Sequence, residues 1–145
     1  MKVAAGWSVL PGGEEAAQEA YRQVAQRLGG SPSFLLVHAS PAYDTSAVIR
    51  ELRSLAPDVP LHGGTTCTGV LTVDGYHSVD GRGLGILGFS DAGGSYGVCL
   101  EEVAGDVTVA VAAKAALDQA LEAAGRPGEL PTVVLLSSYP GEEEH

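Results

Sequence analysis

The chain has 145 residues, with 8 basic and 18 acidic side chains and a formal net charge of −10. This length suits one domain with a buried core, whereas the acidic balance without a basic cluster excludes a nucleic-acid binder and disfavours contact with anionic membranes. Two cysteines are too few for a disulfide framework, and no apolar run is long enough to insert into a membrane, so we expect a cytoplasmic protein with reduced thiols.

The first half of the chain predicts alternating strands and helices. We expect a strand over residues 2–10, since this N-terminal run lacks the cleavage pattern of a signal peptide. A helix follows over residues 14–28, with two glutamates in its first turn and a glycine after its last residue. The apolar run over residues 33–40 is typical of a strand covered on both faces. Residues 44–57 predict a second helix, capped at Asp44 or at the threonine after it and stopped by a proline.

Beyond residue 68 the pattern changes to short strands. Two of them, over residues 69–73 and 76–79, flank the pair Asp74-Gly75, which favours a hairpin turn of type I′. Further elements are expected as a second hairpin with strands 83–89 and 96–103, a helix from about Asp106 to Gly125, and a last buried strand over 131–138. The final "YPGEEEH" is either an acidic tail or the start of another helix.

The order of these elements predicts an α/β fold. It reads β-α-β-α-β, then an antiparallel meander, then α-β. The β-α units imply parallel pairing and the hairpins imply antiparallel pairing, so we expect a mixed sheet with helices packed on it.

The stretch "PLHGGTTCTGV", residues 60–70, is the strongest candidate for a binding site. Its backbone N–H groups and hydroxyls suit a carboxylate or phosphate, although a turn without a ligand explains the glycines equally well. It is not a phosphate-binding loop of the Walker type, because no lysine follows the glycines. It is not a dinucleotide fingerprint either, because a hairpin follows where that motif needs a helix.

Catalytic and metal sites have weaker support. A nucleophile at Cys67 needs a base such as His62 and an orienting third group, and the sequence shows no candidate for the third. The histidines have no HxH or HExxH spacing, so we expect no metal site. Haem stays open, because a single axial histidine such as His38 in an apolar pocket suffices. We therefore expect a binding protein rather than an enzyme, with a haem protein and a Cys67-dependent enzyme as alternatives.

Two segments together carry a family resemblance. "VPLHGGTTCTGVLTVDG" followed by "GLGILGFSD" resembles the N-terminal domain of the FIST sensory family, found in bacterial signal-transduction proteins. Members carry a strand leading into a turn of small residues, here residues 64–69, then a hairpin and a glycine-bearing strand ending in Phe-Ser, here Phe89-Ser90. The end, "TVVLLSSYPGEEE", is similar to the strand and helix start that continue the domain in longer members. The resemblance covers residues 1–145 and implies one such domain, incomplete at its C-terminal end and without the companion C-terminal domain.

The resemblance implies a sensory domain that binds a small ligand, such as an amino acid or a small carboxylate, and signals to a downstream protein or domain. Some members bind haem and respond to nitric oxide, which adds a gas sensor as the alternative. The residues expected to line the site are Gly63, Gly64, Thr65, Thr66 and Cys67, with His38, Ser40 and His62 as second choices. Cys67 stands where alanine or serine is commoner in the family. An incomplete sheet leaves an unpaired edge, so we also expect a homodimer.

Overall fold

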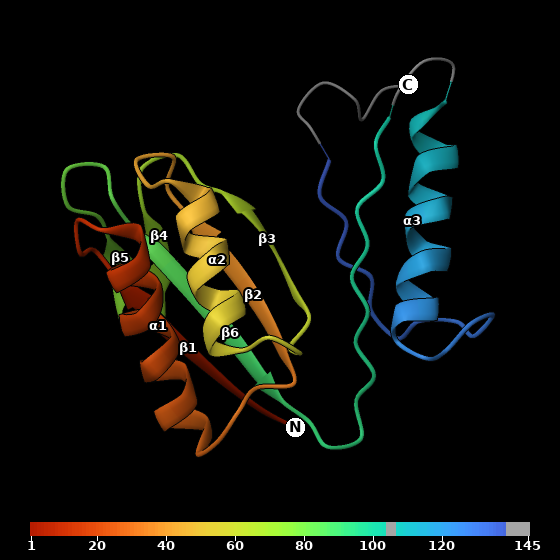
Figure 1. Cartoon of the computed structure of the whole chain (residues 1–145), viewed down its shortest axis with the longest axis horizontal. Helices are drawn as coiled ribbons and strands as arrows, with labels where there is room; N and C mark the ends of the chain where they lie inside the picture. Colours follow the sequence, from red (N-terminus) through yellow and green to blue (C-terminus); the bar gives the residue numbers. More distant parts are fainter. Residues whose placement is uncertain (104–106, 139–145) are drawn as a thin grey trace. The chain divides into compact units, whose positions relative to one another are not determined.

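A computed structural model describes residues 1–103 and 107–138. The chain divides into two compact units, Met1–Gly94 and Ser95–His145, which are described here one at a time (Figure 1). The predicted α/β class with a mixed sheet is confirmed.

The first unit contains a four-stranded mixed sheet. Its strands, in spatial order, are β1 (Lys2–Ser8), β6 (Leu84–Ser90), β2 (Phe34–Ala39) and β3 (Leu61–Thr65). Strand β6 runs antiparallel to both of its neighbours, whereas β2 and β3 are parallel. The predicted pairing of β6 with residues 96–103 is therefore wrong, since β1 and β2 occupy both edges of β6.

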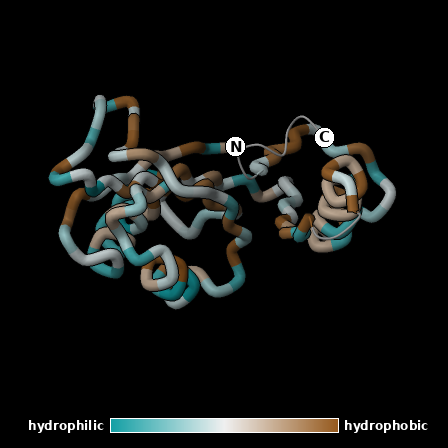
Figure 2. The backbone as a smooth tube through the Cα atoms, turned by 90° about the horizontal axis from the view of Figure 1, so that it is seen from above, coloured by the Kyte–Doolittle hydropathy of each residue, from teal (hydrophilic) through white to brown (hydrophobic). Residues whose placement is uncertain are grey.

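Two helices, α1 (Gly13–Leu28) and α2 (Thr45–Leu55), cover one face of this sheet (Figure 1). Helix α1 lies close to the strands because two of the strand residues beneath it are glycines. A Cβ on Gly6 would overlap the carbonyl oxygen of Ala20, and a Cβ on Gly88 would overlap Val24. Each helix turns an apolar side to the sheet, because its buried residues recur at helical spacing, as Ala20, Val24 and Leu28 do in α1. Figure 2 shows that hydrophobic and hydrophilic residues are mixed along the backbone. The predicted cap of α2 is confirmed at Asp44, whose side chain accepts from the backbone N–H of Ser46.

A separate hairpin follows β3, made of β4 (Val70–Thr72) and β5 (Gly75–His77). The predicted hairpin is confirmed, but its predicted turn type is wrong. Asp74 does not have a positive φ, and the left-handed residue is Gly75, with φ 115°. The two positive φ angles of a type I′ turn occur instead at Asp80 and Gly81, 50° and 75°.

The second unit contains helix α3 (Val109–Ala123), which begins after the N-cap Thr108. The strands predicted over residues 96–103 and 131–138 are wrong, because neither segment is a strand in the structure. Both segments are apolar enough for strands. A segment becomes part of a sheet only through hydrogen bonds to a neighbouring strand, and among the described residues neither segment has such a pairing. The residue predicted to start the helix, 106, and the acidic end, 139–145, lie outside the described residues.

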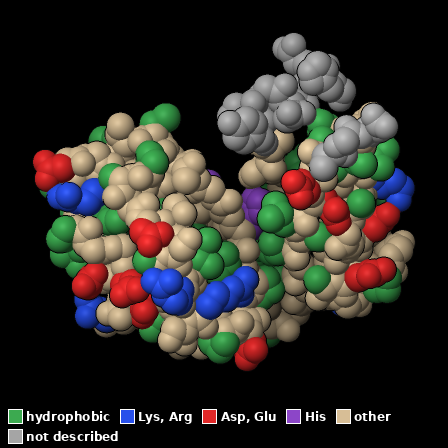
Figure 3. All heavy atoms as spheres, turned by 45° about the horizontal axis from the view of Figure 1, so that its top comes forward, with side chains coloured by type: hydrophobic (Ala, Val, Ile, Leu, Met, Phe, Trp, Pro, Cys, Tyr) green, Lys and Arg blue, Asp and Glu red, His purple; other side chains and the backbone are tan. Residues whose placement is uncertain are grey.

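The charged side chains of the first unit are mixed in sign. On the face drawn in Figure 3, acidic and basic groups lie among one another. Arg50 pairs with Glu14 at 3.1 Å between α2 and α1, and Gln18 donates to Glu51 across the same pair of helices. Within the described part of the chain, no helix is long and apolar enough to cross a membrane.

Candidate functional site

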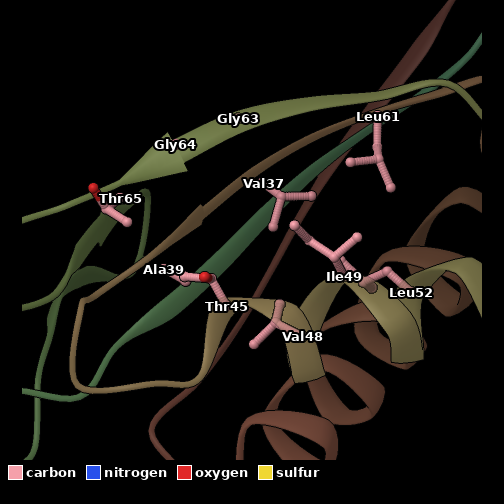
Figure 4. A pocket seen from close by; sticks show the side chains of 10 residues that line it. All are labelled: Val37, Ala39, Thr45, Val48, Ile49, Leu52, Leu61, Gly63, Gly64 and Thr65. Atoms are coloured by element: carbon pink, nitrogen blue, oxygen red, sulfur yellow. The ribbon is translucent and has the colours of Figure 1, made fainter. Parts of the chain in front are cut away.

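A cavity of about 200 Å³ lies between α2 and the strands β2 and β3 (Figure 4). Its lining residues come from these three elements: Val37, Ala39, Thr45, Val48, Ile49, Leu52, Leu61, Gly63, Gly64 and Thr65. The cavity therefore opens beside β3, the strand at the end of the sheet.

The walls of the cavity are aliphatic for a simple geometric reason. Val48 and Leu52 are four residues apart on α2 and thus lie on the same face of the helix, and both are buried. Val37 and Ala39 are two residues apart on β2, so both point to the helix-covered face of the sheet. Ile49 is 48% exposed and lies at the mouth. The apolar seam that packs α2 on the sheet also makes the wall of the cavity.

Two threonines are the polar side chains among the lining residues. Thr45 is the first residue of α2, and its hydroxyl oxygen points toward Ala39 (Figure 4). Thr65 ends β3 and directs its hydroxyl away from α2 (Figure 4). None of the described residues that line the cavity carries a charge. The cavity is therefore an open, aliphatic groove, in which the exposed Thr45 supplies a hydroxyl at the α2 end.

The two glycines of β3 differ in their surroundings. A Cβ on Gly63 would overlap the carbonyl oxygen of Val37, whereas a Cβ on Gly64 would meet no heavy atom within 4 Å. Gly63 is required for the close approach of β3 to β2. Sequence reasoning placed these glycines in a turn, and this is wrong: Gly63, Gly64 and Thr65 belong to β3, and the turn spans residues 66–69.

Of the residues predicted for the site, the structure brings Gly63, Gly64 and Thr65 together in the lining of the cavity. The remaining five lie outside that lining: Thr66, Cys67, His38, Ser40 and His62.

Two of these five residues hold the ends of the strands together. Ser40 is fully buried and exchanges hydrogen bonds with Gly83, through its backbone N–H at 2.8 Å and its hydroxyl oxygen at 3.2 Å. The backbone N–H of Thr66 donates to the carbonyl of Ala39 at 2.9 Å, while the Thr66 hydroxyl oxygen is buried and has no partner among the described residues.

The other three are more accessible. Cys67 is an exposed free thiol, His38 is exposed, and His62 is half-buried. Within residues 1–103 and 107–138, no three His, Cys, Asp or Glu side chains gather as metal ligands would.

A buried tyrosine lies in the loop that leads from β2 into α2. The hydroxyl of Tyr43 donates to the carbonyl of Leu10 at 2.8 Å. Burial raises the pKa of Tyr43 above its usual value, the guanidinium of Arg82 lowers it in part, and the carboxylate of Glu19 raises it further. Tyr43 therefore stays neutral at physiological pH and ties this loop to the one after β1.

Sequence reasoning missed the aliphatic residues of the cavity as site residues. The signal was present, since Val48 and Leu52 stand four residues apart in the sequence and mark the inner face of α2. What the sequence does not show is that α2 and β3 line the same cavity, so that part of this apolar face becomes a cavity wall.

One comparison with known proteins identifies the family of the chain. The family model described as FIST N domain matches residues 33–144, which is more than half of the chain and includes β2, α2, β3 and every lining residue of the cavity. No match was found among curated proteins or among solved structures. The chain therefore belongs to the FIST N domain family, whose members are sensory domains of signal transduction.

Proposed function

We propose that the chain senses a small molecule by binding it in the cavity between α2 and β3. The observation that carries this proposal is the cavity itself, whose lining includes Gly63, Gly64 and Thr65. These residues lie in the stretch that carries the family resemblance. In this proposal the chain is a binding module and performs no reaction.

The position of the cavity suggests how binding is passed on. A ligand there touches α2 on one side and β3 on the other, so it stabilises one spacing of these two elements over others. Helix α2 is also joined to α1 by the pairs Arg50–Glu14 and Gln18–Glu51. A change in α2 thus reaches the exposed surface, where a downstream signalling protein or domain can detect it.

The proposal also includes the cellular location and the oligomeric state of the protein. We place it in the bacterial cytoplasm, on the grounds of composition and family resemblance. We also propose a homodimer, since β3 ends the order of the described sheet and has β2 as its neighbour there. Light scattering on the purified protein tests the dimer, and a monomeric mass contradicts it.

The haem alternative finds no support in this cavity. Haem iron is ligated by His, Cys, Met or Tyr side chains, and the described lining contains none of them. A cavity of about 200 Å³ is also smaller than the roughly 300–1,000 Å³ typical of drug-sized ligands.

A ligand screen followed by ¹H–¹³C methyl NMR tests the proposed function. Small carboxylates, amino acids, alcohols and ketones are added one at a time, and the methyl resonances of Val48 and Leu52 are followed. We expect at least one compound to shift them. Ile49→Trp fills the mouth of the cavity and should abolish the shift, whereas Leu71→Ala, at an 80% exposed position on β4, should not. If no compound moves these methyl groups, the cavity is not a ligand site.

A further inference from the structure

We infer that the ligand of this cavity is an uncharged, mainly aliphatic molecule with a single hydroxyl or carbonyl group, rather than an amino acid or a carboxylate. This inference rests on the proposed function, because it assigns a ligand class to the same cavity.

The residues that line the cavity indicate which ligand chemistry it favours. The aliphatic part of the lining consists of Val37, Ala39, Val48, Ile49, Leu52 and Leu61. Such walls favour a ligand that removes apolar surface from water. They offer no hydrogen bond to a group that loses its water on entry, so a polar ligand body is penalised.

The absence of charged side chains in the described lining disfavours the two ligand types implied by the family resemblance. An amino acid brings an ammonium and a carboxylate, and each needs a partner when it leaves water. No described lining residue supplies a charge of either sign. The charged group next to Thr45 in the chain is Asp44, whose carboxylate already caps α2 by accepting from Ser46. A ligand carboxylate at this end would be repelled by Asp44.

Of the polar side chains in the lining, we assign that of Thr45 to the polar group of the ligand. The hydroxyl of Thr45 points toward the cavity, whereas that of Thr65 points away (Figure 4). A hydroxyl donates one hydrogen bond and accepts others, so it matches a ligand alcohol or carbonyl at the α2 end.

The volume of the cavity indicates the size of the ligand. An engineered apolar cavity of about 150 Å³ in another protein holds benzene. The cavity here is about 200 Å³, which corresponds to roughly six to nine non-hydrogen atoms by the same measure.

Three probes with the same isobutyl group separate the ligand classes: 3-methylbutan-1-ol, 4-methylpentanoate and leucine. Each is titrated into the full chain while the methyl resonances of Val48 and Leu52 are followed. We expect 3-methylbutan-1-ol to bind at least tenfold more tightly than the other two. If leucine or 4-methylpentanoate binds as tightly as the alcohol, this inference is overturned while the proposed function stands. If none of the three probes and no compound of the wider screen shifts these methyl groups, the proposed function fails, and the inference with it.

Substitutions at two lining residues sharpen the test. Thr45→Val removes the hydroxyl at nearly constant volume and should weaken the alcohol about two- to tenfold, as loss of one neutral hydrogen bond does, while Thr45→Ser should restore binding. Ile49→Lys supplies the missing cation at an exposed position and should make 4-methylpentanoate bind more tightly than it binds to the unmodified chain. If Thr45→Val binds the alcohol unchanged, the hydrogen bond assigned to Thr45 is wrong. If Ile49→Lys leaves 4-methylpentanoate unaffected, lack of charge is not what excludes the carboxylate. Either result overturns the inference.

Discussion

The indole ring of Trp7 and the imidazole ring of His77 are stacked, with 3.6 Å between their centroids and 9° between their planes. Trp7 belongs to β1 and His77 to β5, so this pair joins the hairpin to the sheet. The same imidazole shares a hydrogen bond with the hydroxyl of Thr72, 2.8 Å away on the facing strand of the hairpin. The ring of His77 therefore makes an aromatic contact with β1 and a hydrogen bond with β4.

His77→Ala should loosen the hairpin without unfolding the sheet. The change removes the stack and the bond to Thr72, and we expect a loss of about 1–2 kcal/mol in the free energy of unfolding. Urea denaturation measures that loss, and hydrogen exchange should show faster opening of β4 and β5 than of β6. Leu71→Ala, at an 80% exposed position on β4, is the control. Equal exchange in β5 before and after the His77 change would show that the stack does not hold the hairpin.

The raised pKa of Tyr43 predicts a loss of stability in alkali. Its folded pKa lies above the usual 10.0, so the neutral form is favoured in the folded protein. The corresponding stability is fully present below pH 10 and is lost as pH rises through the folded pKa. Unfolding free energies measured between pH 8 and pH 11 should therefore fall at the upper end. Tyr21, whose pKa burial also raises, contributes in the same direction.

Tyr43→Phe distinguishes the contribution of Tyr43 to the loss of stability in alkali from that of Tyr21. The variant should lose about 0.5–1.5 kcal/mol near pH 8, because the hydrogen bond to Leu10 is gone. It should also show a shallower decline in alkali, since one titrating group has been removed. A decline as steep as that of the unmodified chain would mean that Tyr43 is not responsible for it.

The surroundings of the two glycines of β3 predict that one of them tolerates substitution by alanine and the other does not. Gly63→Ala places a methyl group against the carbonyl of Val37 and should cost about 1–3 kcal/mol, the usual cost of an overpacked position. Gly64→Ala meets open space and should change stability by less than about 0.5 kcal/mol. Thermal or urea unfolding of the two variants side by side is the measurement, and equal stabilities would contradict the register of β3 on β2.

Cys67→Ser should leave ligand binding unchanged. Cys67 is exposed and lies outside the described lining of the cavity, so a change of sulfur to oxygen there does not alter the walls. Titration of the variant with 3-methylbutan-1-ol, compared with the unmodified chain, is the measurement. A large loss of binding would favour a role for the thiol, and thiol labelling against pH would then show whether Cys67 is activated as a nucleophile.

Local signals in the sequence predicted the local structure. The first helix and its glycine end, the cap at Asp44 and the hairpin after residue 69 all depend on neighbours within a few residues, and all are confirmed. Type I′ geometry was assigned to the wrong Asp-Gly pair, because both pairs satisfy the same rule. Only the strands that each turn connects distinguish them.

Long-range pairing was not predictable in the same way. Nothing near residues 84–90 says that they insert between β1 and β2, and without that knowledge residues 96–103 looked like their partner. The cavity has the same origin: Val48 and Gly63 each fit a local pattern, but the space between them exists only after α2 and β3 are brought together. The local pattern of these residues is thus visible in the sequence, whereas the elements that surround them are not.

The position of β6 between β1 and β2 has a consequence for synthesis of the chain. In the described sheet β1 pairs with β6 alone, in a register that joins Lys2 to Ser90 and Ser8 to Leu84. Strand β1 therefore stays without this hydrogen-bonding partner until β6 has been made, more than seventy residues further along the chain. Such non-local pairing slows folding, so the centre of this sheet closes late, and β1 is a segment that a chaperone has time to meet.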